Sequence, residues 1–170
     1  MPDSPTPWLD DDDLATWVAW LRLSTELPGA LSRQLQADSD LTIQDYDVLV
    51  QLAEAPDDRL RTSALAQAVH WERSRLSHHV KRMEARGLVV RIACEDDGRG
   101  NFVALTPAGR GALERAAPGH VRAVRELFLG GLDAGQRRSL GELTAAMLDH
   151  LAAAGALGDD ATDEPVSPRG

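Results

Sequence analysis

The stretch that decides the fold covers residues 73–105 and reads RSRLSHHVKRMEARGLVVRIACEDDGRGNFVAL. In its first half, Leu76, Val80 and Met83 follow the i, i+4, i+7 spacing of one helical face. Gly87 comes soon after that stripe, at a position where a glycine in the left-handed conformation commonly ends a helix. The first half therefore predicts a helix that ends just before this glycine.

The second half of the stretch changes from a helical to a strand-like period. Apolar residues gather in two short runs, 89–92 and 102–105, and turn-forming residues fill 95–101 between them. This pattern is typical of a β-hairpin with a long loop. A further short helix is expected over 62–69, with Leu65 and Ala66 among its inward residues. Two short helices joined by a tight turn and followed by a β-hairpin, the wing, form the winged helix-turn-helix arrangement.

Polar and basic side chains cover the outer face of the second short helix. The inward stripe holds the helix on the body, which leaves the outer face free to contact DNA. The second helix of this arrangement enters the major groove, where arginine suits bidentate contacts to guanine. At the tip of the wing an arginine stands between two glycines and is expected to reach the minor groove. The predicted DNA contacts are Arg73, Ser74, Arg75, Ser77, His78, Lys81, Arg82 and Arg99.

The N-terminal part predicts an arm and a long helix. Residues 1–7 contain three prolines and no apolar periodicity, so we expect a flexible arm. Four consecutive aspartates at 10–13 suit a helix start, where carboxylates meet the positive end of the helix dipole. A helix is expected over 8–36, and Pro28-Gly29 should kink or interrupt it.

Three further helix starts can be recognised from capping residues. Thr42 with Asp45, and Asp133 with Gln136, have the spacing of a capping box. Thr106 is followed by a proline, which matches the preferred first two positions of a helix. A helix should therefore follow each of these three sites.

The C-terminal part predicts two more helices and a tail. One helix should run to about residue 129, with a disturbance at Pro118-Gly119, and the last carries an apolar stripe at Leu140, Leu143, Met147 and Leu151. The final residues are acidic and aperiodic, so we expect disorder there. The expected division is a flexible arm (1–7), an N-terminal dimerisation helix (8–36), the winged helix-turn-helix domain (42–105), C-terminal dimerisation helices (106–153) and a disordered acidic tail (158–170).

Charge is distributed unevenly along the chain. The 170 residues carry 27 acidic and 18 basic side chains, a net charge of -9, which argues against a surface that grips nucleic acid everywhere. Residues 1–58 account for 13 acidic and 2 basic side chains, whereas residues 59–99 hold 9 basic and 5 acidic ones. The positive excess therefore falls on the predicted helix-turn-helix and wing, as a DNA-binding face requires.

Several classes of protein are disfavoured. No apolar run approaches the roughly 20 residues of a membrane helix, and the single cysteine, Cys94, fits a reducing, cytoplasmic location. Neighbouring acidic residues should keep its thiol unreactive. His78 and His79 are adjacent on a helix and point about 100° apart, which disfavours a shared metal ion. We expect no enzyme activity and no cofactor, since no nucleophile elbow or phosphate-cradling loop is present.

The segments 61–66, 74–77 and 82–89, the Asp97-Gly98-Arg99 wing and the stretch 105–110 together resemble MarR-family transcriptional regulators. The tryptophan-rich N-terminal helix is similar to an actinobacterial branch of that family. The resemblance implies a mainly α fold, a winged helix-turn-helix with N- and C-terminal dimerisation helices and a two-stranded β-wing. It also implies a homodimer that binds a near-palindromic operator in double-stranded DNA, commonly as a repressor released by a small phenolic or anionic effector.

The resemblance assigns roles to individual residues and shows two departures. Arg99 takes the place of the wing arginine, with Asp97 expected to orient it. Glu72 stands where the family usually has a small polar residue, so it should cap the second short helix poorly. His79 stands where the family often has leucine, which puts the family's packing there in doubt and is expected to tune the placement of the helix.

A ligand pocket is the least determined part of the prediction. Trp17, Trp20, Arg22 and Tyr46 are candidates for binding an aromatic carboxylate, although the tryptophans equally suit a dimer core. Two alternatives stay open: a redox-sensing regulator acting through Cys94, and a winged-helix module used for protein association.

Overall fold

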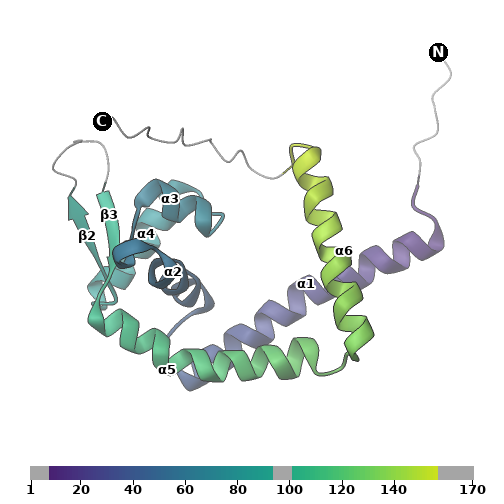
Figure 1. Cartoon of the computed structure of the whole chain (residues 1–170), viewed down its shortest axis with the longest axis horizontal. Helices are drawn as coiled ribbons and strands as arrows, with labels where there is room; N and C mark the ends of the chain where they lie inside the picture. The colour runs from purple at the N-terminus through teal and green to yellow at the C-terminus, as the bar shows by residue number, and fades with distance from the viewer. Residues whose placement is uncertain (1–7, 94–100, 157–170) are drawn as a thin grey trace, which may run out of the picture. The chain divides into compact units, whose positions relative to one another are not determined.

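In the computed structural model, residues 8–93 and 101–156 are described. Within these residues the chain is mainly helical, with one small antiparallel sheet (Figure 1). It divides into two compact units, residues 1–43 with 115–131 and residues 44–114 with 132–170, which we describe separately. We call residues 44–114 the winged part.

The first unit is built on α1 (Asp11–Asp38). Asp10 caps this helix, its carboxylate accepting a hydrogen bond of 2.8 Å from the backbone N–H of Asp13, which confirms the helix start predicted from the aspartate run. The unit also contains the second half of α5 (Pro107–Ala123) and the π-helical segment η2 (Val124–Leu129), which contacts α1.

Neither proline interrupts its helix, so the predicted interruptions are wrong, while a kink at either proline stays a prediction. α1 continues through Pro28, and α5 continues through Pro118. A proline removes one backbone donor and crowds one carbonyl, and the other hydrogen bonds of a long helix can maintain it across that site. The change in helical period comes instead at η2.

The winged part holds α2 (Ile43–Glu54, whose first residue belongs to the first unit), α3 (Thr62–Ala68) and α4 (Arg73–Ala85) beside the sheet (Figure 1). A short 3-10 turn, η1 (Pro56–Asp58), follows α2. These three helices form in the segments predicted for them, and their apolar stripes are buried in one core. The core residues that are at most 2% exposed are Val48, Leu49, Leu52, Leu65, Leu76, Val80, Met83, Val89 and Val103.

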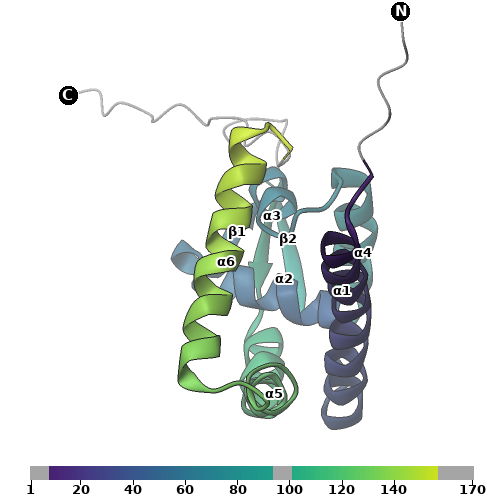
Figure 2. The same ribbon diagram turned by 90° about the vertical axis from the view of Figure 1, so that its right-hand side faces the viewer.

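The sheet has three strands rather than the two predicted. β2 (Val89–Ala93) and β3 (Asn101–Leu105) form the expected hairpin (Figure 1), and β1 (Arg59–Arg61) pairs with the other edge of β3. Figure 2 labels β1 and β2 of this sheet. The register sets Arg61 opposite Phe102 and Phe102 opposite Ile92. Directly opposite residues share a face, so these three side chains lie on one side of the sheet.

The last helix, α6 (Ala134–Ala153), begins at a capping box. The Asp133 carboxylate accepts from the N–H of Gln136, and the Gln136 side chain accepts from the N–H of Asp133, both at 2.9 Å. This confirms the second of the predicted capping signatures. No helix among residues 8–93 and 101–156 is both long and apolar enough to span a membrane.

Candidate nucleic-acid interface

Helix α4 separates its side chains into a buried and an exposed face. Leu76, His79, Val80 and Met83 are buried. The seven predicted contact residues of this helix are all exposed: Arg73, Ser74, Arg75, Ser77, His78, Lys81 and Arg82. The structure thus places the polar and basic residues together on the outside of a helix that is anchored by its other face, as major-groove binding requires.

Hydrogen bonds to α4 position strand β2 of the wing. The guanidinium of Arg91, on β2, donates a 2.7 Å hydrogen bond to the carbonyl of Ser77. The backbone N–H of the same arginine donates to the Glu84 carboxylate at 3.1 Å. These bonds connect the helix expected to enter the major groove with the strand that leads to the wing tip.

The start of α3 is bonded to the other strand of the wing. The hydroxyl of Thr62 donates a 2.7 Å hydrogen bond to the carbonyl of Asn101, the first residue of β3. The hairpin is therefore fixed on both sides, by α4 through β2 and by α3 through β3. The wing tip itself, with Cys94, Asp97 and Arg99, lies outside the described residues, and the roles predicted for those three residues stay predictions.

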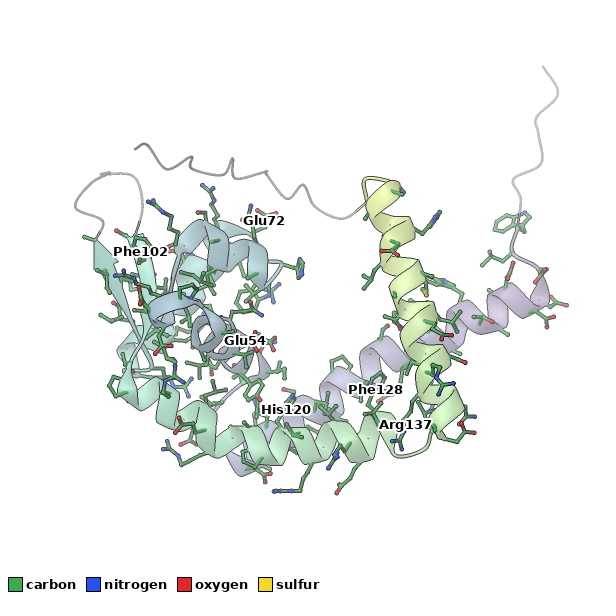
Figure 3. All side chains as sticks on the ribbon, in the orientation of Figure 1. Glu54, Glu72, Phe102, His120, Phe128 and Arg137 are labelled. Atoms are coloured by element: carbon green, nitrogen blue, oxygen red, sulfur yellow. The ribbon has the colours of Figure 1, made fainter. Side chains whose placement is uncertain are left out.

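The sequence reading missed a pair of cationic side chains on the sheet. The Arg59 and Arg61 guanidinium carbons lie 5.4 and 5.2 Å from the centroid of the Phe102 ring, a cation–π geometry. Figure 3 labels Phe102 on the strand pair. The available signal was the alternation Arg-Leu-Arg over residues 59–61, which is too short to identify a strand by itself.

The sequence reading also missed a buried polar cluster beneath α4. Asp45, on α2, is 2% exposed and His79 is 7% exposed. Nε2 of His79 lies 3.0 Å from one oxygen of the Asp45 carboxylate, and the Arg86 guanidinium donates to the other oxygen at 2.7 Å. Arg82 reaches the opposite ring nitrogen, Nδ1, at 2.8 Å. The Arg86 guanidinium compensates the burial of the Asp45 carboxylate.

An aromatic side chain in the turn before α4 joins this cluster. The Trp71 ring meets the His79 ring edge to face, with centroids 5.2 Å apart. The guanidinium carbon of Arg75 lies 4.6 Å from the centroid of the same indole. Two predicted DNA contacts, Arg75 and Arg82, are therefore held by neighbours of the buried histidine or by the histidine itself.

Replacing Glu72 by serine is expected to raise the free energy of unfolding by about 0.5–1 kcal/mol. Glu72 is the N-cap of α4 (Figure 3), and its side chain makes no capping hydrogen bond to any described residue, as the sequence predicted. Serine at an N-cap accepts a hydrogen bond from the first turn. Urea denaturation tests this, with Glu142→Ser inside α6 as the control that removes a glutamate without creating a cap. Equal stability of Glu72→Ser and the wild-type protein would contradict the prediction.

The predicted ligand residues lie on different elements. Trp17, Trp20 and Arg22 belong to α1, where both tryptophans are about half exposed, at 50% and 45%. Arg22 lines a shallow apolar hollow along that helix, together with residues such as Leu14 and Val18. Tyr46 belongs to α2, and its pKa is raised by burial and, to a smaller extent, by Asp47. The phenol is therefore neutral at physiological pH. The ligand pocket predicted from the sequence stays a prediction.

Together, an anchored helix with an exposed basic face and a hairpin fixed beside it define a winged helix-turn-helix protein of the DNA-binding class. Comparisons with known proteins agree. A family model described as the MarR family matches residues 39–100. The transcriptional regulator HosA of Escherichia coli is 35% identical over 110 residues, which are 65% of this chain and 79% of HosA.

Two solved structures of MarR family transcriptional regulators from Streptomyces coelicolor each share 38% identity with this chain. For AbsC the TM-score is 0.81, with 87% of this chain and 99% of AbsC covered. For Sco3205, solved in complex with DNA, the TM-score is 0.82, with 94% and 96% covered. This chain therefore belongs to the MarR family of DNA-binding transcriptional regulators, and the resemblance inferred from the sequence is confirmed.

Proposed function

We propose that this regulator is a homodimeric repressor that binds a near-palindromic operator and leaves it when a small phenolic or anionic effector binds. The observation that carries the DNA-binding mode is the exposed polar face of α4 with its buried anchor. The similarity to Sco3205, a relative solved in complex with DNA, supports DNA binding by this chain. Phosphate contacts would supply affinity, and contacts of α4 and the wing to bases would supply sequence choice.

The dimer is supported by helices that expose large apolar side chains. α1 exposes Trp17, Val18 and Leu21 at helical spacing, and α6 exposes Leu143 and Met147. Apolar stripes of this extent on both helices are expected to be covered by a second copy of the chain. A two-fold dimer presents two copies of α4, which is why a near-palindromic operator is proposed.

Release by an effector follows from differential affinity. The proposed ligand must bind more tightly to a dimer whose wings no longer match the groove spacing. Titrating aromatic carboxylates while following tryptophan fluorescence and DNA binding together tests this. A compound that changes both signals at the same concentration supports the proposal, and a broad panel without any response contradicts it.

Substituting Arg75 by alanine is expected to weaken operator binding about tenfold or more, because a base-contacting arginine contributes about 1–3 kcal/mol. The measurement is fluorescence anisotropy with a DNA fragment upstream of the protein's own gene, repeated over a series of salt concentrations. Arg138→Ala on α6 is the matched control, since it removes the same charge from an exposed helical site outside the winged part. If both variants bind as the wild-type protein does, Arg75 lies outside the interface.

A further inference from the structure

We infer that His79 is a positioning residue for DNA recognition, which sets the directions of the Arg75 and Arg82 guanidinium groups from beneath α4. The inference rests on the proposed DNA contacts of this helix. It goes beyond them because His79 is buried and cannot itself reach DNA, yet it lies at the meeting point of the contacts that hold both arginines.

The hydrogen positions on the imidazole follow from its neighbours. A guanidinium group only donates hydrogen bonds, so Nδ1 of His79, 2.8 Å from Nη2 of Arg82, must be the acceptor. In the neutral ring the hydrogen then lies on Nε2, which faces the Asp45 carboxylate at 3.0 Å. The two ring nitrogens thus have different roles, since Nδ1 accepts from Arg82 while Nε2 lies within ion-pair distance of Asp45 on α2.

The Asp45 carboxylate, 3.0 Å from Nε2, favours this orientation of the ring electrostatically. The second oxygen of its carboxylate accepts from Arg86 at 2.7 Å, so the acid is itself held from two directions. Asp45 and His79 thus bring α2 and α4 into contact, and α4 is the helix that carries the predicted DNA contacts. Leucine at position 79 would keep the apolar contacts but would supply neither ring nitrogen.

The second arginine is reached through an aromatic ring. Trp71 packs edge to face on His79, and its indole face supports the guanidinium of Arg75 at 4.6 Å. A cation over an indole face keeps its outward N–H groups available for other acceptors. An arginine whose direction is set before binding loses less conformational freedom when it contacts a base. His79 therefore restricts Arg75 through the indole and Arg82 directly.

The test is a double-mutant cycle in operator binding. His79→Leu should lower the affinity for the operator fragment, taken from the DNA upstream of the protein's own gene, by about tenfold. A loss of this size is typical of residues whose contributions are coupled. Affinity for a random duplex of equal length should change less than about twofold, because no charged side chain has been removed. In a protein that already carries Arg75→Ala and Arg82→Ala, adding His79→Leu should change operator affinity by less than about twofold.

His79→Met serves as the second variant, because it keeps an unbranched side chain in the buried position but has no nitrogen to accept from Arg82 and no ring to meet Trp71. It should show the same loss of operator affinity as His79→Leu, and binding is normalised to the folded fraction of each variant. Unchanged operator affinity in both variants would overturn the inference, and so would an equal loss in the background that lacks the two arginines. Failure of the wild-type protein to bind any operator fragment would instead overturn the proposed DNA contacts, and the inference with them.

Discussion

Replacing Gly109 by alanine is expected to destabilise the winged part by about 3 kcal/mol, although glycine to alanine inside a helix is ordinarily stabilising by about 0.5–1 kcal/mol. Gly109 lies in the first turns of α5, where the helix passes the start of the wing. A Cβ atom at this position would stand 2.0 Å from the carbonyl oxygen of Leu88 and 3.0 Å from a methyl group of Leu105. The nearer atom belongs to the backbone, so a rotamer change cannot relieve the overlap.

The overlap falls at a junction that several hydrogen bonds define. The hydroxyl of Thr106 donates to the carbonyl of Gly87 at 2.7 Å and accepts from the N–H of Gly109 at 2.9 Å. The second of these bonds confirms the N-cap predicted at Thr106. Moving α5 to make room for a methyl group would stretch these hydrogen bonds. It would also disturb the wing, because β2 begins and β3 ends beside this junction. We therefore expect weaker DNA binding together with lower stability.

The measurement is the thermal unfolding midpoint of Gly109→Ala, which should fall by roughly 6–12 °C for a chain of this size. Gly141→Ala is the matched control, because Gly141 is also helical and a Cβ there meets nothing within 4 Å among the described residues. The control should unfold at the wild-type temperature or slightly above it. A Gly109→Ala protein as stable as this control would show that α5 can shift without cost.

The sequence predicted the winged part well where the signal is local. The stripe of Leu76, Val80 and Met83 predicted α4 because a helical face repeats within a few residues. The hairpin is recognisable because two apolar runs flank turn-forming residues. The same local reasoning overestimated the effect of prolines on helices. Pro28 and Pro118 are locally unfavourable, but the surrounding turns maintain the helix at both sites.

Contacts between residues far apart in the chain could not be predicted from the sequence. The sequence suggested that Asp45 is part of a capping box. In the structure its carboxylate is buried against His79, on α4, and Arg86, just beyond the end of α4. Strand β1 is three residues long and becomes a strand only because β3 offers it a partner some forty residues later. Such pairs leave no periodic trace in a single sequence.

Placing aspartate at both Leu143 and Met147 is expected to convert the proposed dimer to a monomer and to weaken operator binding by about 100-fold or more. Leu143 and Met147 are one helical turn apart on α6, and they are 64% and 53% exposed in the isolated chain. Two carboxylates on this stripe would have to be desolvated in a dimer interface, at a cost that apolar packing cannot offset. The large effect on DNA follows because two joined half-site contacts gain about 10²–10⁴ in avidity over one.

Size-exclusion chromatography with light scattering measures the mass, and anisotropy with the operator fragment measures the binding. The matched control is Ala145→Asp, which adds a carboxylate to the same helix on the side away from the stripe and should leave both mass and affinity unchanged. Circular dichroism separates loss of the dimer from loss of the fold, because the winged part has its own buried core around Leu49, Leu76 and Val103. A double variant that stays dimeric would mean that α6 lies outside the subunit interface. A monomer that binds the operator as tightly as the wild-type protein would mean that a single α4 and its wing account for the affinity, which the two-fold, near-palindromic mode of binding does not allow.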